Sequence, residues 1–166
     1  MKKENLKKYC TTSGVFALFL FLDIITKHLV EMNIGLYERI NVVGSFVQLT
    51  RLYNRGGVFG IMQGHQMFFL IVSLIVFILL ILFYVFEKNK SYPFAVAMGL
   101  IFSGAIGNIL DRLLGKPGVV DFIYIGDDRV YRWPAFNVAD AAIVVGAILL
   151  VAVFYVQERK NKKTVE

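Results

Sequence analysis

The chain has 166 residues, 57% of them hydrophobic, and a mean hydropathy of +0.64. Because soluble domains are about 45–50% apolar, this composition indicates a membrane protein rather than a soluble domain, and the length suits one domain over residues 1–166. The formal net charge is +6, and a single cysteine, Cys10, excludes an intramolecular disulfide framework and a cysteine-based metal cluster.

Four apolar segments are predicted to form transmembrane helices, at about residues 12–30, 67–86, 92–111 and 139–156. The second is the clearest, because its uncharged run is long enough to cross the roughly 30 Å hydrocarbon layer at about 1.5 Å per residue. The first follows a basic start that resembles a secretory signal, but no small-x-small cleavage site comes after it. We therefore interpret it as a retained helix, interrupted by Asp23 and Lys27.

The distribution of Lys and Arg predicts the orientation of these helices. The two tails and the short 87–91 turn carry ten Lys or Arg against four acids, whereas the opposite side, counted with Asp23, Lys27 and the acids at the helix ends, has eight of each. We therefore expect a multi-pass membrane protein with both termini in the cytoplasm and the long connections outside. The basic tails suit contact with anionic membrane phospholipid, and we expect no nucleic-acid partner.

The outer connections, residues 31–66 and 112–138, are long enough to carry function. Alternating residues from Phe46 to Arg51 indicate a short strand, residues 119–125 are strand-like, and residues 130–133 can return beside them. The predicted fold is an α-helical membrane protein with four transmembrane helices, a small extracytoplasmic β-sheet and long outer loops.

Small residues recur at every fourth position of the third predicted helix, as Gly99, Ser103 and Gly107. This spacing lets another helix approach closely. We expect these three residues to serve helix packing rather than chemistry.

Several carboxylates and amides are predicted to lie near the outer membrane surface. A charged side chain within a membrane helix costs on the order of 3 kcal/mol on insertion scales and is by default a functional hypothesis. The topology brings to one depth four acids and three amides from all parts of the chain: Asp23, Asp111, Asp121, Asp140, Asn54, Asn108 and Asn137.

Each of these residues also has a purely structural explanation. Asp140 opens the fourth helix, where the helix dipole favours a carboxylate. Asp111 and Arg112 are expected to form an interfacial ion pair, and Asp23 and Lys27 have the i, i+4 spacing of a pair within one helix. The coincidence of all of them at one depth, rather than any one residue, suggests a site.

Acids and amides without a histidine partner favour one chemistry. His28 and His65 are isolated, and zinc normally requires His or Cys ligands, so we expect no metal or cofactor. Two adjacent carboxylates share one proton, as in aspartic proteases. From the residues alone, the partner of Asp140 is either Asp111 or Asp121. A proton-coupled carrier and a non-catalytic scaffold are the alternative classes.

Five motifs follow one another along the chain: DIITK (Asp23–Lys27), NRGGVFG (Asn54–Gly60), GNILDR (Gly107–Arg112), VVDF (Val119–Phe122) and FNVAD (Phe136–Asp140). In this order and topology the chain resembles lipoprotein signal peptidase, the signal peptidase II family, over nearly its whole length. The family consists of bacterial inner-membrane aspartyl endopeptidases that cleave diacylglyceryl-modified prolipoproteins just before the lipidated cysteine.

The resemblance implies that Asp121 and Asp140 are the catalytic pair and that the site lies near the outer membrane surface. It implies lipid-modified prolipoprotein signal peptides and membrane phospholipid as partners, and we expect a monomer. Supporting and substrate-binding roles fall to Asp23, Lys27, Asn54, Gly56, Asn108, Asp111, Arg112 and Asn137. The chain departs from the family pattern at Gly57-Val58, where two alanines are frequent, and at Ala141, where serine is common.

Overall fold

The computed structural model describes residues 2–56 and 62–165. It contains four helices long and apolar enough to cross a membrane: α1 (Lys2–Asn33), α2 (Gln66–Phe86), α3 (Tyr92–Leu113) and α4 (Val138–Val165). The four predicted spans coincide with these helices, but α1 and α4 extend past their apolar parts. The extensions are rich in lysine and carry the i, i+4 ion pairs Glu4–Lys8 and Glu158–Lys162, which favour continued helix.

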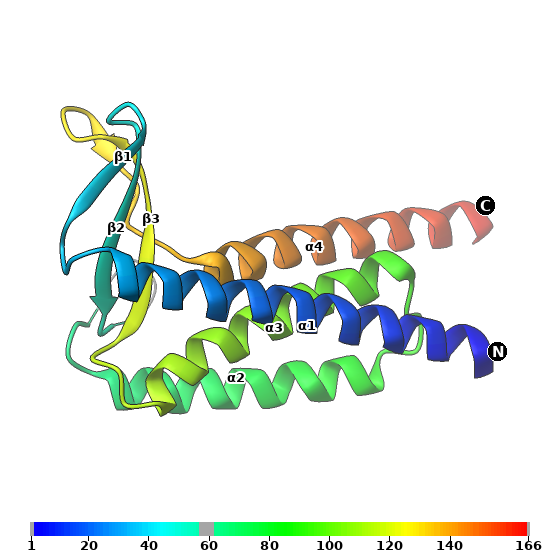
Figure 1. The fold of residues 1–166 in the computed structure, drawn as a ribbon. Helices are drawn as coiled ribbons and strands as arrows, with labels where there is room; N and C mark the ends of the chain where they lie inside the picture. The colour runs from blue at the N-terminus through cyan, green and yellow to red at the C-terminus, as the bar shows by residue number, and fades with distance from the viewer. Residues whose placement is uncertain (1, 57–61, 166) are drawn as a thin grey trace.

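The two ends of the helix bundle carry different parts of the chain. Both termini and the turn between α2 and α3 lie at one end of the bundle, and the β-sheet lies at the other (Figure 1). This arrangement has the parity expected of four membrane spans.

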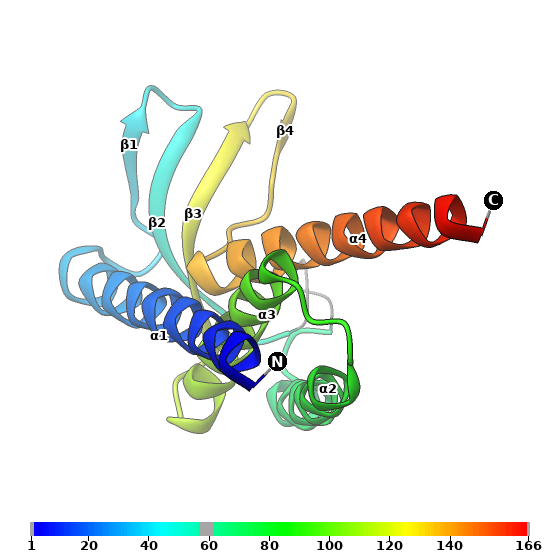
Figure 2. The same ribbon diagram turned by 90° about the vertical axis from the view of Figure 1, so that its right-hand side faces the viewer.

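Helix α3 lies between α1 and α4, with α2 to one side (Figure 2). In its most apolar stretch 61% of α3 is buried, compared with 11% for α2. Close approach requires glycine on two faces of α3. A Cβ atom on Gly104 would collide with the Ala139 carbonyl of α4, and one on Gly107 would collide with the Asp23 carboxylate of α1. In the predicted stripe, a Cβ on Gly99 would likewise collide with the Thr12 carbonyl of α1, so the stripe serves helix packing and, at Gly107, also borders the acidic residues.

The predicted outer sheet is present as four antiparallel strands in the order β1-β2-β3-β4. The strands are β1 (Arg39–Val43), β2 (Val47–Asn54), β3 (Val119–Asp127) and β4 (Tyr131–Arg132). The sequence analysis did not predict β1, although its first four residues alternate polar and apolar; all five of its residues are exposed.

The base of the sheet packs against the outer end of α1. Val30 of α1 and Ile34, which directly follows the helix, form a buried cluster with Val120 and Phe122 of β3. Burial of such side chains contributes about 1.5–3 kcal/mol each. Because β3 is held here and pairs Leu52 with Asp121, the sheet carries Asp121 to the ends of the helices.

Candidate active site

Asn137 joins the two carboxylates of VVDF and FNVAD. Asp121 is 2% exposed in β3, and Asp140 lies in the first turn of α4. The buried Asn137 amide donates to Asp121 Oδ1 at 2.7 Å, and its Oδ1 accepts from the Asp140 backbone N–H at 2.8 Å. The Asn137 backbone N–H in turn donates to Asp140 Oδ2 at 3.3 Å. FNVAD is therefore a reciprocal helix cap whose two side chains also belong to a buried acidic group.

Two further amides complete the surroundings of this pair. Asn108 Nδ2 donates to Asp140 Oδ1 at 2.7 Å, and the Asn54 side chain hydrogen-bonds Asp121. Within residues 2–56 and 62–165, neither Asp121 nor Asp140 has a salt-bridge partner within 4.0 Å. We name Asp121, Asp140, Asn54, Asn108 and Asn137 the amide-held cluster.

A second group of acids lies beside the first but has a different kind of partner. Lys27, only 2% exposed, places its Nζ 2.7 Å from Asp23 Oδ2 and 2.9 Å from Asp111 Oδ2. Lys116 Nζ lies 3.0 Å from the other Asp111 oxygen. A buried charge is tolerated when it is paired, and Lys27 neutralises carboxylates from two helices. We name Asp23, Lys27, Asp111 and Lys116 the ion-paired cluster.

Helical spacing explains why this cluster is interior. Asp23, Lys27 and Val30 recur at i, i+4 and i+7, so they share one face of α1, and Ile34 follows directly after the helix. All four are buried. The polar half of this stripe therefore faces the acidic site, and the apolar half packs on the base of the sheet.

The ion-paired cluster also positions the backbone that carries the other acids. Asp23 Oδ1 accepts from the Ala139 backbone N–H at 2.9 Å, and Asp111 Oδ2 accepts from the Val120 N–H at 3.2 Å. Ala139 precedes Asp140 and Val120 precedes Asp121. Lys27 Nζ also donates to Asn108 Oδ1 at 3.2 Å, which directs the Asn108 amide toward Asp140.

The predicted ion pair between Asp111 and Arg112 is wrong. These are consecutive helical residues, so their side chains point about 100° apart, and Asp111 pairs with Lys27 and Lys116 instead. Arg112 donates to the carbonyls of Asn108 at 3.1 Å and Gly56 at 3.3 Å. Its charge interacts first with Asp140 and then with Asp121. Arg112 therefore acts on the amide-held cluster.

The first outer connection contributes to the site through the start of NRGGVFG. The Gly56 N–H donates to Asn54 Oδ1 at 3.0 Å, and the Gly56 carbonyl receives Arg112. Gly56 thus closes a link between β2 and α3. Residues 57–60 of the motif, which include the departure at Gly57-Val58, lie outside the described residues.

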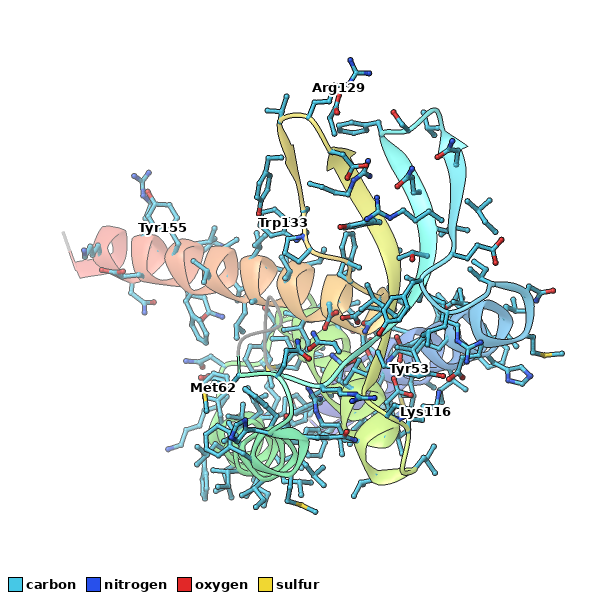
Figure 3. The ribbon with its side chains drawn as sticks, turned by 90° about the vertical axis from the view of Figure 1, so that its left-hand side faces the viewer. Tyr53, Met62, Lys116, Arg129, Trp133 and Tyr155 are labelled. Carbon is cyan, nitrogen blue, oxygen red and sulfur yellow. The ribbon has the colours of Figure 1, made fainter. Side chains whose placement is uncertain are left out.

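Three residues that the sequence did not indicate belong to this part of the site: Lys116, already in the ion-paired cluster, and Glu31 and Tyr53, which extend it. Lys116 Nζ bridges from Asp111 to Glu31 Oε2 at 2.8 Å, and Glu31 Oε1 accepts from the Tyr53 hydroxyl at 3.1 Å. Tyr53 and Lys116 lie where the sheet meets the helices (Figure 3). The chain reverses through Gly115 at φ +71°, a conformation that favours glycine. In the sequence, only the position of Gly115-Lys116 directly after the third span pointed to Lys116, and this position does not indicate which acid Lys116 would pair with.

The electrostatics of the amide-held cluster favour a retained proton. Burial, reinforced by the charge of Asp140, raises the pKa of Asp121 to about 8. Hydrogen bonds from Asn54 and Asn137 and the charge of Lys27 oppose this shift. The raised pKa of Asp121 favours retention of a proton by this pair, as expected when two nearby carboxylates share one. Among the described residues, three or more His, Cys, Asp or Glu side chains do not converge in a way that could hold a metal ion.

The fold and site together define a membrane-spanning enzyme with an acidic site at one end of a four-helix bundle. The sequence model described as Signal peptidase (SPase) II matches residues 15–156. The chain therefore belongs to the signal peptidase II family, a family of peptidases, as the five motifs predicted.

Individual relatives agree with this membership. A protein named lipoprotein signal peptidase from Staphylococcus haemolyticus is 34% identical over 154 residues, covering 91% of this chain and 93% of the relative. One of the same name from Staphylococcus carnosus is 36% identical over 145 residues, covering 86% and 89%. A bacterial membrane enzyme solved by the in meso method at 2.3 Å resolution is 30% identical and superposes with a TM-score of 0.80, covering 92% of this chain and 91% of that one.

Proposed function

We propose that this protein is an aspartyl endopeptidase that removes the signal peptide from diacylglyceryl-modified prolipoproteins, cutting just before the lipidated cysteine. The relatives named lipoprotein signal peptidase support the substrate class. The catalytic pair is Asp121 and Asp140. Family membership restricts the chemistry to peptide hydrolysis, and the acidic residues that line this end of the bundle are the available catalysts.

One observation carries the choice of Asp121 and Asp140. Of the acids at this end, Asp23 and Asp111 are ion-paired with Lys27, so each has a direct counter-ion. Asp121 and Asp140 are held by amides instead. Amides fix carboxylates in place without neutralising them, so this pair keeps the capacity to exchange a proton near neutral pH.

The environments of the two acids divide their roles. Asp140 lies at the N-terminus of α4, accepts from a backbone N–H and faces the charge of Arg112, all of which favour its ionised form. Asp121, with its pKa raised to about 8, holds the shared proton. Asp140 takes a proton from water as the water oxygen attacks the scissile carbonyl carbon, and Asp121 donates its proton to the carbonyl oxygen. When the C–N bond breaks, Asp140 gives its proton to the leaving nitrogen and Asp121 regains one from the diol.

The remaining site residues position this pair and the substrate. Asn108 and Asn137 orient the carboxylates, and Asp23, Lys27 and Asp111 support the backbone beside them. Asn54, Gly56 and Arg112 lie where the first outer connection crosses the site, and they are the substrate-binding side. A signal peptide entering from the bilayer meets the site at the sheet end, which the charge distribution assigns to the outer surface, and lies extended along it.

A cleavage assay with matched variants tests the proposal. The purified full chain in detergent is given a diacylglyceryl-modified prolipoprotein, with and without a chelator. We expect Asp121→Asn and Asp140→Asn each to reduce the rate at least about 10³-fold, and the chelator to have no effect. Asp128→Asn is the control, because this carboxylate is exposed on the sheet and its loss leaves the rate within about twofold of wild type.

Two results would overturn the assignment. Normal cleavage by either site variant removes that residue from the catalytic pair, and loss of activity with the chelator replaces the proposed chemistry with metal-assisted hydrolysis. Cleavage of unmodified prolipoprotein at the same rate would remove the lipid from the proposed specificity.

A further inference from the structure

A basic cavity of about 550 Å³ lies at the end of the bundle opposite the sheet. It is formed by the start of α1, the turn between α2 and α3, and the start of α3. Three lysines line it, Lys8, Lys88 and Lys90, against one acid, Glu4. Because Glu4 pairs with Lys8 at 2.9 Å, Lys88 and Lys90 supply the excess positive charge. A concave surface with this balance attracts an anionic ligand.

The N-terminus of α3 adds to this field. Ser91 caps the 22-residue helix by accepting from the Phe94 N–H at 3.3 Å, and Ser91 and Tyr92 line the cavity. The helix dipole places partial positive charge at this end. A helix N-terminus combined with lysines is a combination that binds phosphate groups.

A second hollow, of about 290 Å³ and mostly aromatic, runs between α1 and α2 with α3 behind it. It lies on membrane-spanning helices, so it opens toward the acyl layer of the bilayer. The Thr12 and Tyr84 hydroxyls satisfy each other at 2.9 Å, which leaves the lining effectively apolar. Its aromatic members are Tyr9, Phe16, Phe77, Tyr84 and Phe102.

Lys90 lies at the border between the two hollows. It lines the basic cavity, and its ammonium lies 5.8 Å from the ring centroid of Tyr9 and 5.3 Å from that of Tyr84, both of which line the aromatic hollow. Along α1, Lys8 and Phe16 are eight residues apart, which corresponds to about 12 Å. The polar cavity and the apolar groove are therefore neighbours, within the length of part of an acyl chain.

We propose that the two hollows together bind one anionic phospholipid, with its phosphate in the basic cavity and an acyl chain in the aromatic hollow. A headgroup with net negative charge is favoured, since the ammonium of a zwitterionic headgroup would meet the same lysines. The site lies at the opposite end of the bundle from the acidic residues and is independent of the proposed catalytic function.

Binding by the purified full chain in detergent tests this site, with native mass spectrometry as the readout. The probes are dioctanoyl phosphatidylglycerol, dioctanoyl phosphatidylcholine and inorganic phosphate. We expect phosphatidylglycerol to bind at least about tenfold more tightly than phosphatidylcholine, and Lys8→Gln/Lys88→Gln/Lys90→Gln to weaken it about 100-fold, since each lysine contributes roughly a factor of five. The matched variant Lys7→Gln/Lys160→Gln/Lys162→Gln removes as many charges from the same end and is expected to bind within about threefold of wild type.

Further measurements distinguish the contribution of the headgroup to binding from that of the acyl chain. Ser13 lines the aromatic hollow, and Ser13→Phe fills it, so we expect weaker phosphatidylglycerol binding. A salt series on the wild-type protein keeps the test valid if the triple lysine variant does not fold. Phosphatidylglycerol binding by the wild type is expected to weaken at least about tenfold between about 0.05 and 0.5 M NaCl. Equal loss in both lysine variants, equal binding of phosphatidylcholine, salt-independent binding, or inorganic phosphate binding as tightly as the lipid would each overturn the proposal. Unchanged binding by Ser13→Phe would overturn the acyl-chain part.

Discussion

The two acidic clusters at the sheet end of this protein contain the same residue type, with Asp23, Asp111 and Asp121 buried and Asp140 half-buried, yet they are built in opposite ways. Asp23 and Asp111 share the buried ammonium of Lys27, whereas Asp121 and Asp140 receive amide hydrogens from Asn137 and Asn108. The comparison indicates that a buried lysine is the appropriate partner for aspartates that hold helices in place. Amide support suits acids that must change protonation state.

Replacing Lys27 with Met should have the largest effect on stability. The variant leaves Asp23 and Asp111 buried without their shared partner, and removing one member of a buried ion pair costs about 3–5 kcal/mol. Thermal unfolding in detergent measures this loss. Adding Asp23→Asn and Asp111→Asn to Lys27→Met should recover much of it, because the uncompensated charges are then gone. A melting temperature for Lys27→Met equal to that of wild type would contradict the assigned role.

Asn137→Ala should affect both function and stability, because Asn137 caps α4 and also binds Asp121. Loss of the cap and of buried hydrogen bonds costs about 1–3 kcal/mol. Peptidase activity should fall by about 10²-fold, as the two carboxylates lose their common support. Asn33→Ala is the control, since the Asn33 side chain is exposed and bonds only within α1. Equal effects of the two substitutions would show that Asn137 has no special position.

Asp121→Asn should become more stabilising as the pH rises. The folded-state pKa of Asp121, about 8, lies above its ordinary value of 3.8, so its ionisation costs folded-state stability between about pH 4 and pH 8. Between about pH 4 and pH 8 the free energy of unfolding of the wild type therefore falls relative to that of Asp121→Asn. Above about pH 8 the difference between the two proteins is constant. Each 1 kcal/mol of relief corresponds to about 2–4 °C in melting temperature. A difference that is independent of pH, or that reverses, would contradict the retained proton.

Lys116→Met should have the smallest effect. The Lys116 side chain is 24% exposed, whereas that of Lys27 is 3% exposed, and Asp111 keeps Lys27 when Lys116 is lost. A partly solvated ion pair contributes about 0–1 kcal/mol, so thermal unfolding should change by no more than about 4 °C. A loss equal to that of Lys27→Met would mean that solvent exposure does not distinguish the two lysines.

Much of the fold could be predicted because long apolar runs and alternating strand patterns are local signals. The four spans and the strands near Phe46 and Val119 follow from such patterns. Local patterns did not reveal β1, which is fully exposed, or the true partners of Asp111. Neighbours in sequence suggested Arg112, but helix geometry turns the two side chains apart, and the partners come from α1 and from the turn after α3.

The candidate site was predictable as a set of residues but not as two clusters. Topology brings Asp23, Asp111, Asp121 and Asp140 to one end of the bundle. Which of them meets Lys27 depends on side-chain direction across three elements, which residue spacing does not encode. The resemblance supplied Asp121 as the partner of Asp140. The separation between ion-paired and amide-held acids supplies a physical reason for that choice.

The hydrogen bond from the Ala139 N–H to Asp23 has a consequence for biosynthesis. It joins α1 to the start of α4, and both Asp140 and its support at Asn137 come with α4. A chain halted before α4 holds Asp23 and Lys27 without the start of that helix. On the proposed assignment of Asp140, such a chain cannot hydrolyse its substrate.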